Sequence, residues 1–242
     1  VWIAEIPADQ VFAMYQEAGD GALSAGKLEA AELCYRKLSY LNEQAPQGAF
    51  GRALVAERRG EQETAARLME RIAPVGGRGY GPAHLWLARQ LWAAAGAAAN
   101  ETVGQRLQSI ERHLTSVLAE QPKELEAHRL LGQLYATTGR VRQAVEHLVQ
   151  IAERAPESRL TLAQLYAVLG QQPQAEASGN AARDYFQGRL KEDAADVEAG
   201  IGLARAELFL GKPEVAVEVL KQGWKNTQDE RYRAELAPVY LS

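Results

Sequence analysis

The sequence predicts an all-α fold, an α-solenoid of about six helical hairpins and a partial seventh, from three observations. The segment "LGQLYATTGRVRQA" (131–144) recurs as "LAQLYAVLGQQPQA" (162–175) and "LARAELFLGKPEVA" (203–216). Apolar residues downstream of the last alanine of each unit return after three or four positions, which is the spacing of one helix face. Prolines then close four of the units, as proline does shortly after a helix ends, at positions 46, 74, 122 and 156.

Composition narrows the classes of function. The chain has 242 residues, 47% hydrophobic and 24% charged, which suits a protein with a buried core. Its net charge of -4 and scattered basic residues argue against nucleic acid as a partner. A single cysteine, Cys34, excludes an internal disulfide, and no apolar run is long enough for membrane insertion by this segment. The alanine-, arginine- and glutamine-rich composition looks bacterial and leaves the compartment open, with the cytoplasm favoured over the periplasm.

The most regular unit, "HRLLGQLYATTGRVRQAVEHLVQIAERAP" (128–156), resembles the tetratricopeptide repeat (TPR). That family's signature is Trp-x2-Leu-Gly-x2-Tyr, then Ala-x3-Phe, then Pro, over about 34 residues. His128 stands where the family often has Trp. The resemblance covers almost the whole chain and implies a right-handed superhelix that acts as a non-catalytic scaffold for protein-protein interaction.

The glycines of residues 130–144 are expected to be scaffold rather than a phosphate-binding loop, because the pattern recurs and no strand precedes it. Gly132 should lie where two antiparallel helices cross closely, with Tyr135 beside the crossing. The later glycines should end each first helix in a left-handed conformation, and the alanines should mark close helix contacts. These positions are Gly139, Gly170 and Gly211, and Ala144, Ala175 and Ala216.

We expect one solenoid domain over residues 1–242, a fragment of a longer array. Its units run approximately over 9–45, 46–75, 81–122, 124–156, 157–195 and 197–227, with a partial unit at 229–242.

The third unit carries an insertion at approximately 94–106, because Ile110 follows Ala65 by 45 residues. Its alanines favour extension of both helices of the hairpin, with Asn100 or Thr102 as the N-cap of the second. The segment "PVGGRGYG" (74–81) is too rich in glycine to be helical, and 180–193 should prolong a second helix by about two turns.

No catalytic constellation, cofactor site or metal site is predicted, and the protein is not expected to be an enzyme. His84 and His128 occupy equivalent places in two units, as do His113 and His147, which indicates packing or surface positions rather than metal ligands. Cys34 has no basic neighbour in sequence that would activate its thiol.

The candidate site follows from the resemblance, since first helices of successive repeats line the concave side in this family. Arginines and apolar residues alternate there, with Asp20 as the one acid, so the expected partner is a peptide or helix, acidic and with apolar anchors. Gln16 and Asp20 would repel the terminal carboxylate that chaperone-tail-binding members hold. The groove residues are Phe50, Arg58, Leu85, Arg89, Trp92, Arg129, Gln133, Thr137, Gln164, Arg205 and Phe209.

Two other functions stay open at this point. The array is a self-assembly module that associates through its exposed last half-unit, or it is the docking or substrate-recruiting arm of a larger enzyme or export machine.

Overall fold

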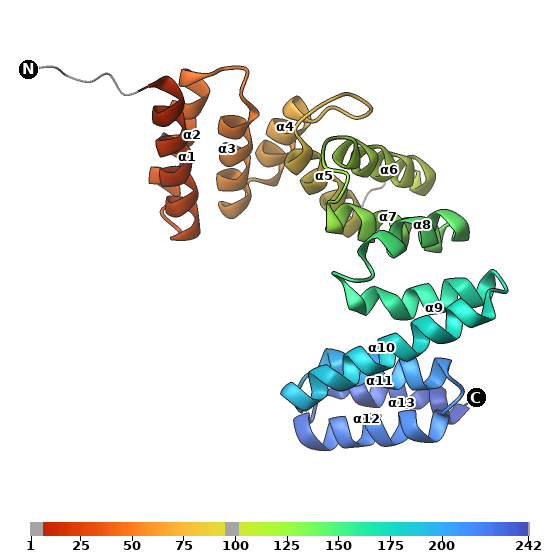
Figure 1. The fold of residues 1–242 in the computed structure, drawn as a ribbon. Coiled ribbons are helices and arrows are strands. Elements are labelled where there is room, and N and C mark those ends of the chain that lie inside the picture. The colour runs from red at the N-terminus through yellow and green to blue at the C-terminus, as the bar shows by residue number, and fades with distance from the viewer. Residues whose placement is uncertain (1–6, 95–101, 242) are drawn as a thin grey trace, which may run out of the picture. The chain divides into compact units, whose positions relative to one another are not determined.

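The computed structural model describes residues 7–94 and 102–241, and these contain thirteen α-helices, one short 3-10 helix and no strand. The chain is an all-α TPR solenoid, as predicted. Residues 1–124 and 125–242 form two compact units, which we call unit 1 and unit 2. The boundary falls between the third and the fourth hairpin (Figure 1).

Unit 1 contains three hairpins that pack against one another in chain order. Pro46 begins its third helix, where the missing N–H of proline is not needed. The helices are α1 (Ala8–Ser24), α2 (Leu28–Leu41), α3 (Pro46–Arg58), α4 (Gln62–Ile72), α5 (Gly81–Ala93) and α6 (Val103–Glu120).

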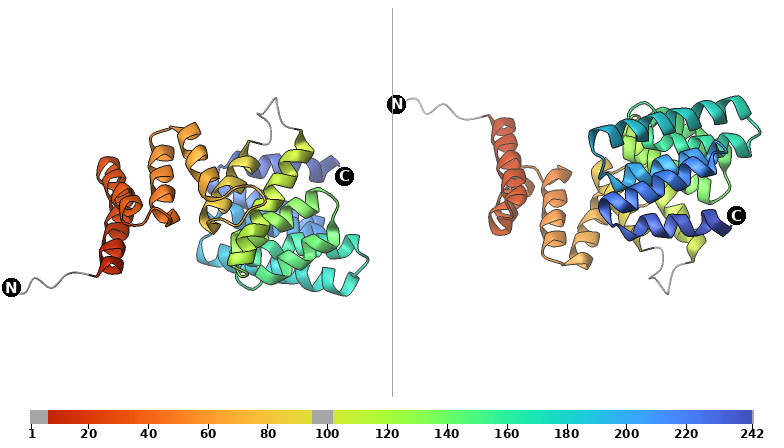
Figure 2. Two further views of the ribbon diagram at one scale, coloured as in Figure 1. Left: turned by 90° about the horizontal axis from the view of Figure 1, so that it is seen from above. Right: turned by 90° about the horizontal axis from the view of Figure 1, so that it is seen from below.

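Unit 2 contains three more hairpins and one final helix, seen from two further sides in Figure 2. The expected prolongation of a second helix is confirmed, because α10 runs for 21 residues. The elements are α7 (Leu125–Thr137), α8 (Val141–Ile151), η1 (Pro156–Ser158), α9 (Arg159–Val168), α10 (Gln172–Glu192), α11 (Val197–Phe209), α12 (Pro213–Thr227) and α13 (Glu230–Leu241).

Five hairpins turn through the same backbone geometry. At each turn a glycine has a φ between 70° and 79°, the left-handed region that a side chain disfavours. The next residue donates its N–H to a carbonyl one turn back, as Arg140 does to Tyr135 at 2.8 Å, which satisfies the end of the first helix. The prediction for the three glycines of the recurring segment is therefore confirmed. The five glycines are Gly26, Gly60, Gly139, Gly170 and Gly211.

Small residues let the helices of a hairpin approach closely, as the repeat predicts. A Cβ on Gly132 would lie 2.5 Å from Leu148 Cδ2, so nothing larger than glycine fits at that crossing. Ala144, Ala175 and Ala216 are completely buried, and Tyr135 is buried beside them. The core of each unit thus consists of apolar contacts between neighbouring helices.

The third hairpin agrees only in part with its prediction. Thr102 is the N-cap of α6, in a capping box with Gln105, and α6 is long, at 18 residues. The expected extension of the first helix is wrong for the described residues, because α5 ends at Ala93 and is no longer than α3. Asn100 lies outside the described residues. The glycine-rich segment is non-helical over 74–80 as predicted, although Gly81 already begins α5, and Tyr80 N donates to Ile72 O at 2.8 Å across it.

Candidate functional site

In unit 1, α3 and α5 carry five of the predicted groove residues. Glu57 holds these helices together, because its Oε1 accepts from Trp86 Nε1 at 2.9 Å and from Gln90 Nε2 at 3.2 Å. The apolar members, Phe50, Leu85 and Trp92, are partly buried, whereas Arg58 and Arg89 are exposed. We call these five residues the unit 1 stripe.

Phe50 also has a structural role, which the sequence pattern did not indicate. Its ring lies edge-on to that of Tyr80, with 5.3 Å between centroids, and packs against the cluster around Trp86 and Leu87. Only part of the Phe50 surface therefore remains for a partner, and Arg58 and Arg89 are the exposed members of the stripe.

Unit 2 carries the other six predicted residues, on α7, α9 and α11, and several of them are already engaged. Arg129 forms an ion pair with Glu126 at 3.6 Å and donates to Gln133 Oε1 at 3.3 Å. Thr137 donates its hydroxyl to the Gln133 carbonyl at 3.0 Å. Gln164 is exposed, and Phe209 is partly buried. Arg129, Gln133 and Thr137 are thus joined to one another on α7.

Arg205 is occupied by an acid that the sequence argument left out. Its guanidinium donates to both carboxylate oxygens of Glu235, and the Nε bond measures 3.1 Å. This contact raises the pKa of Arg205. Asp20, the acid expected on the groove, is itself tied to packing, since it accepts from the Tyr35 hydroxyl at 2.7 Å. A carboxylate ligand of Arg205 would therefore have to displace Glu235.

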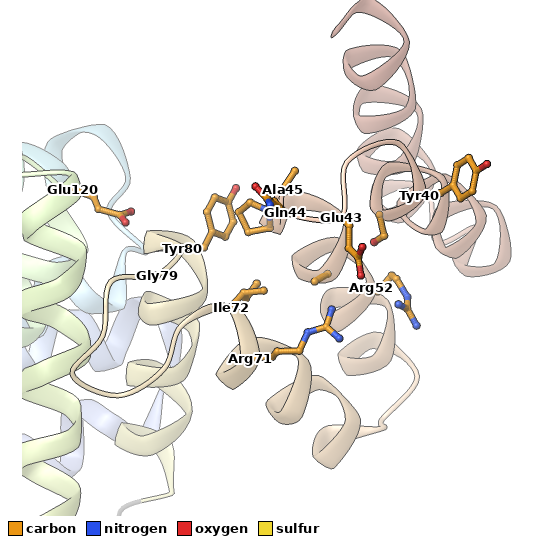
Figure 3. A pocket seen from close by; sticks show the side chains of 13 residues that line it. Tyr40, Glu43, Gln44, Ala45, Arg52, Arg71, Ile72, Gly79, Tyr80 and Glu120 are labelled. Atoms are coloured by element: carbon orange, nitrogen blue, oxygen red, sulfur yellow. The ribbon is translucent and has the colours of Figure 1, made fainter. Parts of the chain in front are cut away.

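A hollow of about 920 Å³ in unit 1 was not predicted at all (Figure 3). We call it the arginine hollow. Its walls come from the end of α2, α3 with the loop before it, the end of α4, the loop before α5 and the end of α6. The charged residues and tyrosines that line it are Tyr40, Glu43, Arg52, Arg71, Tyr80 and Glu120.

Charge in the arginine hollow is mixed. Figure 3 shows Glu43 and Arg71 pointing toward each other across the opening, with Arg52 on the same side as Glu43 but turned away from it. Arg52 is held from behind by Glu32, with 3.1 Å between Nε and Oε1, whereas Arg71 is exposed. Guanidinium groups in such a place suit a carboxylate or another planar acceptor.

Two further side chains shape the hollow. Glu120 accepts from the N–H of Gly81 at 3.0 Å, a stabilising position for an acid at the N-terminus of α5. Burial, together with Asp20 and Glu120, raises the pKa of Tyr80, so its hydroxyl keeps its proton at neutral pH. Five separate elements meet here, and for that reason no local spacing in the sequence indicated the site.

The histidines pack against each other in two pairs, a contact that the expectation of packing or surface positions did not specify. His84 faces His113 with 2.8 Å between Nδ1 atoms, and His128 faces His147 with 2.9 Å. Among the residues that the structure describes, no three His, Cys, Asp or Glu side chains are close enough to hold a metal ion. Within the same residues, no helix is both long and apolar enough to cross a membrane.

Comparison with protein families decides the type of repeat. One tetratricopeptide repeat model matches residues 105–160, and another matches 46–71 and 156–178. The chain is a tetratricopeptide repeat protein. TPR arrays are generally non-catalytic scaffolds for protein interaction, and this chain has that architecture. A search of curated proteins finds no match.

Solved TPR structures share the fold at low sequence identity. Pseudomonas aeruginosa PilF superposes with a TM-score of 0.66 at 15% identity, over 95% of this chain and 97% of PilF. PilW, a type IV pilus biogenesis factor, gives 0.61 at 15% identity, over 94% and 99%. Cut9 in the APC/C Cut9-Hcn1 complex gives 0.59 at 15% identity, and there the chain spans only 42% of the longer protein. These likenesses concern the fold alone.

Proposed function

We propose that the chain is an interaction scaffold that binds an acidic peptide or helix of a partner protein, with the unit 1 stripe as its principal contact. Carboxylates of the partner meet Arg58 and Arg89, and its apolar anchors pack on Phe50, Leu85 and Trp92. One observation carries the proposal: exposed guanidiniums alternate with partly buried apolar side chains on two helices that Glu57 locks together.

The arginine hollow extends this proposal to the neighbouring surface of unit 1. Arg71 offers a second place for a carboxylate, and Glu43 and the Tyr80 hydroxyl offer partners for main-chain groups of an extended segment. We propose a separate, weaker contact in unit 2, formed by Arg129, Gln133, Thr137, Gln164 and Phe209. Arg205 takes part only if a ligand replaces Glu235.

The test uses the full chain and an array of immobilised short peptides that vary in number of acidic and of large apolar residues. We expect peptides with both kinds of residue to bind. Arg58→Glu with Arg89→Glu should weaken that binding by about tenfold or more, because two attractive contacts become repulsive. Fluorescence anisotropy of the selected peptides gives the affinities.

Arg112→Glu is the matched control, since Arg112 is exposed on α6 and belongs to neither the stripe nor the hollow. It makes the same change of charge as each single stripe substitution, Arg58→Glu or Arg89→Glu, and should leave affinity within about twofold. Equal affinity of the stripe variant and the wild type would refute the site. Sedimentation over a range of concentrations tests self-assembly separately, because a peptide-binding scaffold need not associate with itself.

A further inference from the structure

All four histidines of the sequence are used in two contacts of the same geometry. His84 of α5 faces His113 of α6, and His128 of α7 faces His147 of α8. Both ring pairs have centroids 5.1 Å apart, and the ring planes meet at 50° and 47°. Each pair joins the first helix of a hairpin to the second, and each lies wholly within one unit.

A hydrogen bond between two Nδ1 atoms requires one proton between them. One imidazole must donate an N–H and the other must accept it with a lone pair, so the bond exists while the Nδ1 atoms share one proton. If both rings become imidazolium, two positive charges face each other at about 3 Å with no acceptor between them. Two protonated rings therefore cannot keep this contact.

The surroundings of the first pair disfavour charge. His84 is completely buried, its Nε2 has no hydrogen-bond partner within the described residues, and α4 packs on α5 through apolar residues such as Met69. Burial, reinforced by His84, lowers the pKa of His113 to about 4. Burial also lowers the pKa of His84, and Glu120 opposes that shift only in part.

The second pair, His128 and His147, lies nearer to solvent, and its surroundings also disfavour further positive charge. The Tyr135 ring is 5.5 Å from that of His147, and the Arg140 guanidinium covers the Tyr135 ring at 4.2 Å. Burial and His128 lower the pKa of His147, against the effect of Glu146. Where α9 approaches α8, it brings another cation, Arg159, whose Nε donates to Ala152 O at 3.1 Å.

We propose that the two histidine pairs are an acid-sensitive clasp, which holds the α5–α6 and α7–α8 hairpins closed while each pair shares one proton and releases them when both rings are protonated. The sign follows from linkage. An opened hairpin exposes imidazoles with a pKa near 6.5, higher than the pKa of His84, His113 and His147 in the closed hairpins. The open form therefore gains protons, and the closed form loses stability, as the pH falls below about 6.5 toward the pKa of His113, about 4.

The position of the clasp links it to the candidate site. His84 directly precedes Leu85, and His128 directly precedes Arg129, so a movement of α5 or α7 displaces groove residues. Release of a partner in acid rests on the proposed function, whereas opening of the hairpins does not. The experiment accordingly measures opening without any partner.

The full chain is melted by circular dichroism near neutral pH and near pH 5, as the wild type and as His113→Gln with His147→Gln. Glutamine can still hydrogen-bond to the remaining imidazole but takes up no proton. We expect the loss of Tm in acid to be at least halved in the variant. The same loss in both proteins would overturn the proposal, because the carboxylates would then account for it.

Amide hydrogen exchange of the wild type, followed as the pH is lowered, is a second test that does not depend on folding of the variant. Protection in α5–α6 and α7–α8 should fall before that in α1–α2 and α11–α12, which contain no histidine. Uniform loss of protection would overturn the clasp. So would a Zn²⁺-induced rise in Tm that the glutamine variant lacks, because the pairs would then hold a metal rather than a shared proton.

Discussion

Tyr35 in unit 1 and Tyr232 in unit 2 both place a buried ring against glycines of neighbouring helices, and they differ in the hydrogen bonding of the hydroxyl group. Each ring is completely or almost completely buried against two glycines on other helices. A Cβ on Gly51 would lie 2.2 Å from the Tyr35 ring, and one on Gly223 would lie 2.3 Å from that of Tyr232. The Tyr35 hydroxyl donates to Asp20 at 2.7 Å, whereas the Tyr232 hydroxyl has no partner among the described residues.

The comparison separates a steric requirement from a polar one. An aromatic ring that packs directly on a glycine lets helices approach closely. The same contact recurs in unit 2, where Phe186 lies against Gly202. The hydroxyl partner is local, because it depends on an acid that only α1 supplies. Burial raises the pKa of both tyrosines, so each hydroxyl keeps its proton at neutral pH. Four substitutions, two at glycines and two at tyrosines, test this separation.

The largest effect on stability is expected from adding a methyl group at the glycines that contact the tyrosine rings. Gly51→Ala and Gly223→Ala should each lower the free energy of unfolding by about 1–3 kcal/mol, because the new methyl overlaps the tyrosine ring and forces a shift. The two losses should be similar if the contact is purely steric. Urea unfolding monitored by circular dichroism measures both.

Gly188→Ala is the control, since Gly188 is also inside a helix and an added Cβ there meets nothing within 4 Å. It should stabilise by about 0.5–1 kcal/mol through helix propensity alone. A stabilising Gly51→Ala would show that the Tyr35 ring moves aside freely, and the comparison of the two units would then lose its steric basis.

A smaller effect is expected from the hydroxyl that has a partner. Tyr35→Phe should lower the free energy of unfolding by about 1 kcal/mol, because it removes the hydrogen bond to Asp20 while the ring stays between its glycines. In the Asp20→Ala background, which has no side-chain acceptor for the Tyr35 hydroxyl, the same substitution should have a smaller effect. If the double-mutant cycle gives no coupling, the hydrogen bond contributes nothing to stability.

The smallest effect, with the opposite sign, is expected from the hydroxyl without a partner. Tyr232→Phe should leave stability unchanged or raise it by up to about 1 kcal/mol, because a buried polar group without a hydrogen bond is removed. Thermal melts of this variant and of Tyr35→Phe should therefore move in different directions. A loss for Tyr232→Phe equal to that for Tyr35→Phe would mean that its hydroxyl has an acceptor.

Sequence reasoning was most accurate where a structure depends on neighbours in the chain. The left-handed glycines, the N-cap Thr102 and the length of α10 each follow from a few adjacent residues, and each is found. The residues of the unit 1 stripe follow from the family resemblance, and their contact with a partner stays a prediction. The packing role of Phe50 could not be predicted, because its ring contacts Tyr80 from another segment of the chain.

The features that the sequence argument missed depend on residues far apart in the chain. Glu235 lies 30 residues beyond Arg205, and the arginine hollow joins side chains from Tyr40 to Glu120. The histidine pairs were expected to pack, yet their direct contact could not be read from two equivalent positions.

The amino-acid sequence by itself determined the TPR fold, the hairpin turns and the small residues at helix crossings, since backbone conformation and helical period are local properties. Only the tertiary structure decided which arginines meet a carboxylate, where a hollow opens and which rings share a proton. Those outcomes depend on distances between side chains, and packing of the helices sets these distances.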